Sequence, residues 1–588
     1  MTKKLVLLAA AILASTVAQA AGVDVTYTLG SKAGTVQSLL GVNAGPLHWN
    51  SKTTTQDVTG GFKQLGVKSV RTHDFPAAVD MKLMYPDRTK DPTLQSSYNF
   101  TTGGTYGDYS SDTAIATLKD NGLTVYLRIW DSAGGVVAPS SSERANWTQA
   151  AVEVVRHYQE GKWNGYTGLI ATVEIGNEPD SSNFWPSPYT KEDFFKLYSD
   201  TAKAIRAAFP TMKIGGPGIT SSGFATVPGR QWTLAFFDYV KAAGAPLDFF
   251  SWHVYTNTTD DYITGASYYR SELDKRGYAA TELHITEWNT HAQSGATDTA
   301  TIASNESLRI KAQGAALNTT AWINLQQQGV TQSYIYRANN PSTTDPEKYG
   351  LFTADGIPTK TGLAFSLWSE FAAYSDRIDP VASATVSGLK ALAAQRADGQ
   401  VALLVANTGT ASKKWTVSFS DTRKLSSYAL SLKTIDDSHA MVDVTTPAAA
   451  EFDIAAYSVQ LLTLHATGGA FGATATNFGP SSAMLLGANL QTAGADYGQS
   501  RSVYLLAMAG STIVFNDGSK WIPWLGGTFP AYYSGAMPAL LSVPILSAVT
   551  PAQSLNGIQV YMGYGTSANE MVSAGRYKAI VTFGTTSP

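Results

Sequence analysis

Two short stretches of this sequence place a glutamate directly after a run of strand-forming residues. The first, TVEIGNEP, ends in Glu178 and Pro179, and a proline cannot continue a hydrogen-bonded strand ladder. The second, ELHITEWNT, carries Glu287 at the end of its apolar run. Two carboxyl groups on either side of a glycosidic bond can protonate the leaving oxygen and attack the sugar or activate water. We therefore take Glu178 and Glu287 as candidate catalytic residues.

Eight short apolar runs, separated by patterns of helical spacing, must position these two residues. Such alternation predicts parallel β/α units and, with eight of them, a (β/α)8 TIM barrel. Glu178 then follows the fourth strand and Glu287 ends the seventh, so both lie on the carboxyl-terminal face, where such barrels carry their chemistry. The runs cover residues 38–43, 69–73, 124–130, 172–176, 213–216, 248–255, 283–287 and 332–337.

The pattern changes after the eighth unit, and the fold class we predict is α/β with two added all-β parts. A hairpin pattern around Asp398-Gly399 and further short strands indicate a small antiparallel β-sandwich, which the early run 23–28 can join. From about residue 467, Gly, Ala, Ser and Thr dominate, and only seven charged side chains occur in the last 122 residues. The predicted division is 1–20 signal peptide, 21–36 sandwich strand, 37–374 barrel, 375–466 sandwich and 467–588 C-terminal all-β module.

The tail module contains aromatic residues that could stack on sugars, although core packing is the favoured interpretation for scattered aromatic residues. Asn516-Asp517-Gly518 between two apolar runs predicts a tight hairpin there. The aromatic residues are Trp521, Trp524, Tyr532, Tyr533, Tyr561 and Tyr564.

The N-terminus and the composition limit where the protein works and what it binds. Lys3 and Lys4, the apolar run 5–13 and Ala18-Gln19-Ala20 form a signal-peptide pattern, so we expect export to the periplasm or the extracellular space of a bacterium. No later stretch predicts a membrane span. The net charge of −3 argues against nucleic acid as a partner. The chain has no cysteine, and its eight histidines lack metal-binding spacing, so we expect no cofactor and no metal. The oligomeric state is left open.

Several further motifs of the barrel resemble those of glycoside hydrolase family 39, a family of retaining glycosidases in clan A. Asn177-Glu178-Pro179 followed by Asn183-Phe184-Trp185 resembles the acid/base segment, and His284-Ile285-Thr286-Glu287-Trp288-Asn289 resembles the nucleophile strand. The resemblance covers roughly residues 37–465 and does not include the tail. The remaining matches are Arg71-Thr72-His73, Gly215-Gly216-Pro217, His253-Val254-Tyr255 and Tyr349-Gly350-Leu351.

The resemblance implies that Glu178 is the acid/base and Glu287 the nucleophile. For a retaining pair we expect carboxyl groups about 5–5.5 Å apart. We expect Arg71 to hold Glu287 ionised, Tyr255 to donate to the same carboxylate, and Asn177 to donate to a sugar hydroxyl. The rival interpretations are a structural ion pair for Arg71 and satisfied core histidines for His73 and His253.

Other candidates are assigned to substrate binding. Trp130, Trp185 and Trp288 are sugar platforms or packing residues, with one platform expected among them. Asp74 and Asp131 follow strand ends and could bind sugar hydroxyls, and Tyr336 follows the eighth strand.

Several functions remain open at this point. The leading hypothesis is an exported retaining glycosidase that acts on an extracellular polysaccharide or oligosaccharide. Two narrower alternatives are an exo-acting β-xylosidase and an endo-acting enzyme on a bacterial exopolysaccharide or plant cell-wall polymer. A specificity for acidic sugars lacks a matching basic cluster. A non-catalytic carbohydrate-binding or adhesion protein on a barrel scaffold is the alternative of a different class.

Overall fold

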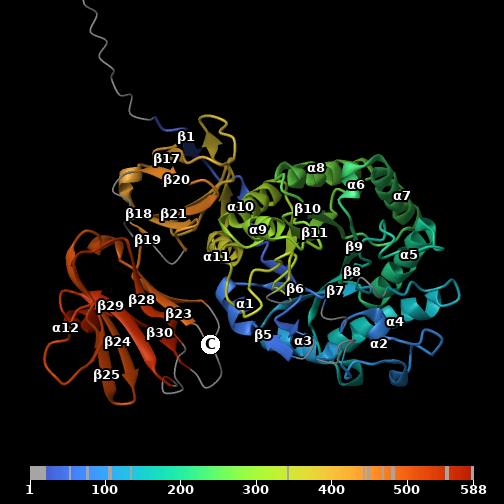
Figure 1. Cartoon of the computed structure of the whole chain (residues 1–588), viewed down its shortest axis with the longest axis horizontal. Helices are drawn as coiled ribbons and strands as arrows, with labels where there is room; N and C mark the ends of the chain where they lie inside the picture. Colours follow the sequence, from blue (N-terminus) through green and yellow to red (C-terminus); the bar gives the residue numbers. More distant parts are fainter. Residues whose placement is uncertain are drawn as a thin grey trace, which may run out of the picture.

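The computed structural model consists of a β/α barrel, a β-sandwich and a C-terminal pair of sheets (Figure 1). The sandwich and the C-terminal sheets lie on the same side of the barrel. The structure describes residues 22–583 except 52–53, 75–77, 104–108, 133–135, 339, 341–343, 441–443, 446–449, 467–468, 479–483, 550–554 and 556. The predicted signal peptide, residues 1–20, therefore lies outside the described residues.

The barrel is a closed sheet of eight parallel strands, which confirms the predicted fold class. Each strand follows its sequence neighbour around the barrel, and the last strand pairs with the first. Each of the eight strands has at most one residue that is not buried, as expected for strands covered by helices outside and by packed side chains inside. In chain order the strands are β3 Gly41–Asn43, β6 Ser69–Arg71, β7 Thr124–Ile129, β8 Ile170–Ile175, β9 Lys213–Ile219, β10 Phe249–Tyr255, β11 Glu282–Asn289 and β12 Gln332–Ile335.

Helices surround this barrel and cover the outer faces of its strands (Figure 1). The two helices expected from apolar spacing around Trp147 and Phe194 are present as α4 and α5. A capping box formed by Thr190 and Asp193 begins α5, and Pro210 follows its end. The helices are α1 Thr59–Leu65, α2 Met81–Met84, α3 Ser111–Asp120, α4 Arg144–Gln159, α5 Lys191–Ala208, α6 Ser222–Ala225, α7 Val227–Ala243, α8 Asp260–Lys275, α9 Thr299–Arg309, α10 Ala312–Gln327 and α11 Lys360–Ala372. The two-stranded β4 Leu47–Ser51 and β5 Thr54–Asp57 follow the first barrel strand.

The sandwich has a four-stranded and a seven-stranded sheet. As expected, the early run joins it as β1, but β1 runs parallel to β17, so the sandwich is not purely antiparallel as predicted. The order β14-β1-β17-β20 makes one sheet and β19-β18-β21-β16-β15-β13-β2 the other. Their bounds are β1 Val25–Leu29, β2 Gly34–Thr35, β13 Asp376–Ile378, β14 Val381–Ala382, β15 Leu389–Gln395, β16 Val401–Asn407, β17 Lys413–Phe419, β18 Tyr428–Ile435, β19 Val444–Thr445, β20 Glu451–Ile454 and β21 Ser458–Ala466.

The tail forms two antiparallel sheets and one short helix, α12 Ala568–Ser573. The Asn-Asp-Gly turn joins β25 to β26, as predicted. Tyr564 is buried, whereas the other five aromatic residues considered above are half-buried. The strands are β22 Gly472–Phe478, β23 Met484–Gln491, β24 Ser500–Ala509, β25 Thr512–Asn516, β26 Trp521–Pro523, β27 Tyr533–Ala536, β28 Leu540–Val549, β29 Gln559–Gly565 and β30 Tyr577–Thr582.

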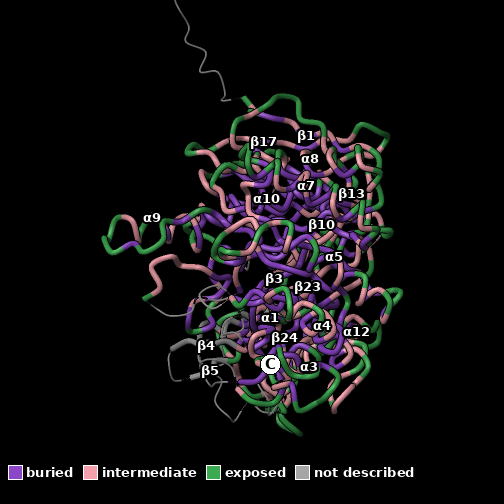
Figure 2. The backbone as a smooth tube through the Cα atoms, turned by 90° about the vertical axis from the view of Figure 1, so that its right-hand side faces the viewer, coloured by how far each residue is buried: buried purple, intermediate pink, exposed green. Residues whose placement is uncertain are grey.

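The hydrophobic cores differ in how they join these parts. One cluster runs from the barrel into the sandwich, where Leu404, Val459 and Leu461 belong to the same cluster as the barrel residues. The tail has a cluster of its own around Leu505 and Met562. Figure 2 shows buried backbone through the interior and exposed backbone at the periphery. Among the described residues, none of the helices has the length and apolarity needed to cross a bilayer.

Candidate active site

The two candidate glutamates come from the carboxyl-terminal ends of β8 and β11. Glu287 is the third residue from the end of β11, and Glu178 follows the end of β8 by three residues. Glu178 has a φ of 45°, a left-handed conformation that costs a non-glycine residue about 1 kcal/mol or more. Its backbone N–H donates to the Gly218 carbonyl at 2.8 Å, which fixes this strained position. Such strain at a non-glycine residue is typical of functional sites.

The structure brings these two carboxylates together with one histidine. One oxygen of Glu178, one oxygen of Glu287 and a ring nitrogen of His253 all lie within 4.8 Å of one another. The two glutamates are separated by more than a hundred residues in the chain, so only the closed barrel creates this proximity. Their side chains differ in exposure: that of Glu178 is 19% exposed and that of Glu287 only 6%.

Three neighbours hold the Glu287 carboxylate. The Arg71 Nη1 donates to Oε1 at 2.8 Å, and the Tyr255 hydroxyl donates to Oε2 at 2.9 Å. His73 Nε2 lies 3.2 Å from Oε1. Both contacts expected for Arg71 and Tyr255 are therefore present. Donors on both oxygens stabilise the anionic form of Glu287 and fix the orientation of its carboxylate.

Arg71 is fully buried and bonds to four acceptors with its three nitrogens. Besides Glu287, it donates to Glu174 Oε2 at 2.6 Å, to Asn43 Oδ1 at 3.0 Å and to Asn177 Oδ1 at 2.7 Å. Burial works to lower the pKa of this guanidinium, but the two adjacent carboxylates outweigh burial and raise the pKa above its ordinary value. A permanent cation therefore lies beneath the paired glutamates.

Glu178 has one close partner, the fully buried His253. His253 Nδ1 lies 2.8 Å from Glu178 Oε1 and 3.7 Å from Glu287 Oε2. Burial works to lower the pKa of His253, but the nearby Glu287 and Glu178 carboxylates raise it above its ordinary value. The ring is thus linked to both acids rather than being a satisfied core histidine.

His73, Asp74 and Tyr336 form a second polar group at the edge of the pair. The Tyr336 hydroxyl donates to Asp74 Oδ2, and His73 Nε2 lies 3.5 Å from Asp74 Oδ1. Burial is the main cause that lowers the pKa of His73 to about 3, so this ring is neutral at pH 7. The Asp74 side chain is 22% exposed and has a φ of 56°. His73 thus links Asp74 to Glu287, and substrate binding by these three residues stays a prediction.

Asn177 lies beside Arg71, and only one end of its side-chain amide is hydrogen-bonded. Its Oδ1 accepts from Arg71, whereas its buried Nδ2 has no partner among the described residues. A buried donor without an acceptor is costly unless a ligand satisfies it. This geometry fits the predicted hydrogen bond to a sugar hydroxyl.

The three tryptophans are packing residues, so the expectation of a sugar platform among them is wrong. Trp288 is completely buried and donates to Ser333 Oγ at 2.7 Å. Trp130 and Trp185 are 2% and 6% exposed, and their rings pack against each other and against Phe194. Rings buried to this extent leave no open face on which a sugar could stack. Their positions near strand ends did not show whether these tryptophans face a sugar or pack in the core.

Asp131 is also a structural residue rather than a sugar ligand. Its Oδ1 accepts the backbone N–H of Lys82 at 2.8 Å, and its Oδ2 accepts that of Val137 at 3.0 Å. It is 3% exposed. Both carboxylate oxygens therefore accept backbone N–H groups of loops, which would otherwise lack a hydrogen-bond acceptor.

Two site residues were not predicted from the sequence, namely Glu174 and Asn43. Glu174 is fully buried, donates nothing as a carboxylate, and accepts from Arg71 Nε and from Ser251 Oγ at 2.7 Å. The sequence does contain an indication for Glu174, because a charged residue inside a buried strand requires a partner of opposite charge. Asn43, at the end of the first barrel strand, carried no comparable signal.

Among the described residues, Glu178, His253 and Glu287 are also the three side chains whose ligand atoms could surround a cation. The Arg71 guanidinium already neutralises Glu287 at 2.8 Å, which disfavours a second cation there. The absence of a metal therefore stays a prediction.

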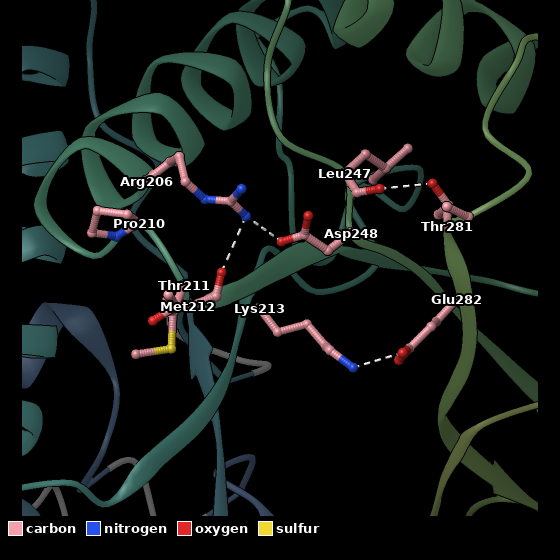
Figure 3. Close-up of a pocket in the computed structure, with 10 residues that line it drawn as sticks. Arg206, Pro210, Thr211, Met212, Lys213, Leu247, Asp248, Thr281 and Glu282 are labelled. Carbon is pink, nitrogen blue, oxygen red and sulfur yellow. Dashed lines mark hydrogen bonds and ion pairs between the residues drawn. The ribbon is translucent and has the colours of Figure 1, made fainter.

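A hollow of about 350 Å³ lies at the opposite, amino-terminal end of β9, β10 and β11 (Figure 3). Its charges are internally paired: Arg206 with Asp248, and Lys213 with Glu282 at 2.6 Å. At this end of a barrel, such pairs serve stability rather than catalysis.

A closed (β/α)8 barrel with two facing glutamates on strands four and seven defines the class of β/α-barrel glycoside hydrolases. Residues 48–287 match the model of glycosyl hydrolases family 39. This part of the barrel is thus similar to that family, which confirms the resemblance found in the sequence.

Characterised relatives of this chain carry different activities. It is 27% identical over 262 residues to a β-xylosidase of Geobacillus stearothermophilus, covering 39% of this chain and 48% of that protein. It is also 27% identical over 227 residues to human α-L-iduronidase, covering 35% of this chain and 30% of that protein. The chain thus spans about half or less of the length of these relatives.

A solved structure with the same fold is a glucosidase from Croceicoccus marinus. The TM-score is 0.60 at 21% identity, and the match covers 75% of this chain and 98% of that one. The likeness concerns the fold alone.

Proposed function

We propose that this protein is a retaining glycoside hydrolase in which Glu287 is the nucleophile and Glu178 the acid/base. The observation that carries the proposal is the separation of the two carboxylates, whose oxygens approach within 4.8 Å. Retaining pairs lie about 5–5.5 Å apart, whereas inverting pairs are about 6.5–9.5 Å apart because a water must fit between them. The geometry therefore favours direct attack by a carboxylate.

The environments of the two acids support this division of roles. Glu287 receives hydrogen bonds from Arg71 and Tyr255 on its two oxygens, which stabilises an oriented anion suited to attack. Glu178 is more exposed and contacts His253 alone among these groups, so it can exchange protons with a leaving group or water.

The reaction then follows in two displacements. Glu287 attacks the anomeric carbon while Glu178 gives its proton to the leaving oxygen, which forms a glycosyl ester and frees the aglycone. Glu178 next takes a proton from water, the water oxygen bonds to the same carbon, and Glu287 leaves as a carboxylate. His253 Nδ1, 2.8 Å from Glu178 Oε1, can donate a hydrogen bond to the ionised form of Glu178 that this second step requires.

We further propose a neutral sugar in the position beside Glu287. Arg71 is the buried arginine that bonds to Glu287, and four of its five N–H donors already bond to protein acceptors. A single Nη2 N–H remains, which is too few for the two parallel bonds by which an arginine holds a sugar carboxylate. A neutral glycone agrees with the names of the β-xylosidase relatives and makes an exo-acting β-xylosidase the narrower candidate.

The predicted signal peptide supports action outside the cytoplasm, on an extracellular polysaccharide or its fragments. A non-catalytic carbohydrate-binding role is the less favoured function, because both acids and the buried groups that orient them are present.

The proposal is tested with a panel of aryl β- and α-glycosides of neutral sugars and of uronic acids. Proton NMR of the first-formed sugar should show the anomer of the substrate, because two displacements retain configuration. An inverted first product would overturn the assigned roles. Binding of glycans without hydrolysis of any substrate in the panel would favour the non-catalytic function.

A further inference from the structure

A large hollow lies where the barrel, the sandwich and the C-terminal sheets meet. Its volume is about 720 Å³, within the range of about 300–1,000 Å³ that is typical of ligand sites. The barrel contributes α1, the second half of α11 and the two residues that follow it. The sandwich contributes β18 and β21, and the tail contributes β22 and β23. Figure 1 shows these elements facing one another on one flank of the barrel.

This hollow is separate from the paired glutamates. Helices of a β/α barrel run antiparallel to its strands, so the last half of α11 lies toward the amino-terminal ends of the strands. Glu178 and Glu287 lie at the other end. A ligand in the hollow is therefore not a substrate held for the reaction.

Ten of the twenty-one residues that line the hollow have hydroxyl or amide side chains. Ser369 comes from the barrel, Thr463 from the sandwich, and Thr474 and Gln491 from the tail, so all three parts contribute hydrogen-bonding groups. Such groups can exchange hydrogen bonds with the many donors and acceptors of a saccharide.

The charges in these walls leave an excess of cations. Lys433 is paired with Glu370, with its Nζ 2.6 and 2.7 Å from the two oxygens. Lys63 has no described carboxylate within ion-pair distance, and Arg396 has only the exposed Asp398 at 3.8 Å. Burial lowers the pKa of His465 to about 4, so this residue is neutral at pH 7. Two cations thus border the hollow on a chain whose net charge is −3.

We propose that this junction hollow is a second glycan site that binds an acidic oligosaccharide. The hydroxyl and amide walls receive the sugar rings, and Lys63 and Arg396 attract their carboxylates. Because the three parts of the chain share the site, bound glycan also fastens the tail to the barrel. The choice of a saccharide rests on the proposed function of the barrel, whereas the charge preference rests on the hollow itself.

The test is calorimetric titration of the full chain with tetragalacturonate and, separately, with neutral xylotetraose. The acidic tetramer should bind more tightly, and Lys63→Gln and Arg396→Gln should each weaken it about fivefold, the size of one exposed ion pair. Thr474→Trp, at an exposed strand position in the wall, should abolish binding by filling the hollow. Lys68→Gln, an exposed lysine that does not line the hollow, is the matched control and should change nothing.

Hydrogen–deuterium exchange of the complex locates the ligand. Protection at 60–66, 463–465 and 474–491 supports the proposal, and protection around 253–255 and 287 places the ligand in the active site and overturns it. Equal binding of both tetramers, no binding of the acidic one, or binding that all four variants leave unchanged would also overturn it. Glycan binding that follows these expectations in a protein without hydrolytic activity would refute the proposed function and leave this site standing.

Discussion

At the scale of single residues, the site depends on a buried cation shared by two carboxylates. Arg71 contacts Glu174 and Glu287 with different nitrogens and reaches Asn177 with the third. Its position is set by four acceptors, so the orientation of Glu287 is fixed before any substrate binds. Preorganised charge of this kind is usually the largest contribution to catalysis.

The first prediction separates the roles of the two acids. Glu287→Ala should abolish turnover of every substrate, since no covalent intermediate can form, and added azide should give a product of inverted configuration. Glu178→Ala should still react with dinitrophenyl glycosides, which need little protonation, but its second step should be slow, so a glycosyl ester accumulates. Mass spectrometry should find that sugar attached to Glu287.

Azide should rescue Glu178→Ala with retention. If azide instead gives retention with Glu287→Ala and inversion with Glu178→Ala, the two roles are reversed.

The second prediction concerns Glu174. Glu174→Gln removes one of the two carboxylates from the completely buried Arg71, and breaking a buried pair costs about 3–5 kcal/mol. The free energy of unfolding measured in urea should fall by about 3–5 kcal/mol. The kcat should also fall, because Arg71 orients Glu287. Glu160→Gln is the control, because Glu160 is about half-exposed and its ion pair with Arg156 is long at 3.9 Å. Equal stability of the two variants would argue against the role given to Glu174.

The third prediction concerns the pH dependence of stability. The pKa of His465 is about 4 in the folded protein, mainly because of burial, and about 6.5 when unfolded. The unfolded chain therefore binds a proton first as the pH falls, and stability is lost between about pH 6.5 and pH 4, by about 3 kcal/mol at the lower limit. His465→Gln should reduce the drop in urea midpoint between pH 7.5 and pH 4.5. An unchanged drop would show that His465 does not cause it.

At the scale of elements, the end of β9 supports both Glu178 and His253. Gly218 has a φ of 64°, accepts the Glu178 N–H, and lies where an added Cβ would be 3.0 Å from His253 Nε2. A left-handed glycine is needed here for two reasons, backbone conformation and close approach. The strand end thus sets the geometry of the acid/base and its partner together.

Gly218→Ala is the fourth prediction. The backbone strain should cost about 1–2 kcal/mol, and displacement of His253 should lower kcat/KM by about tenfold or more. Gly122→Ala is the matched control, with a φ of 66° but no atom near the added methyl. It should lose similar stability and keep full activity. The comparison uses thermal unfolding and hydrolysis of an aryl glycoside, and loss of activity in both variants would mean that strain alone is responsible.

At the scale of the whole molecule, the sandwich and the tail are attached differently. The sandwich shares a hydrophobic cluster with the barrel, so its removal would expose the core. The tail has its own cluster and meets the barrel and sandwich around a polar hollow. This arrangement suits a module that can fold and separate independently.

The fifth prediction is that deletion of residues 467–588 leaves hydrolysis of a small soluble substrate within about twofold of the full chain, because the deleted core contributes nothing to the barrel. Activity on a polymer should decline if the module holds glycan. Equal loss on both substrates would show that the tail is part of the catalytic fold.

The sequence by itself determined the barrel and its two acids. Eight apolar runs with helical patterns between them admit few topologies, and residues at the ends of parallel strands must share one face. Glu178 and Glu287 were therefore placed without coordinates. Family motifs added Arg71 and Tyr255 and their contacts with Glu287, which the structure shows.

Only the tertiary structure decided which polar and aromatic residues face the site. Trp288 follows Glu287 directly in the sequence and Asp131 follows the end of a barrel strand, yet Trp288 is enclosed by packing and Asp131 holds loop backbone. Glu174 lies inside a strand, yet its carboxylate reaches the same arginine as the nucleophile. The direction of a side chain depends on what packs around the strand end, and that neighbourhood comes from residues far away in the chain. The same reason explains why a hollow built from three separate parts of the molecule has no signature in any one of them.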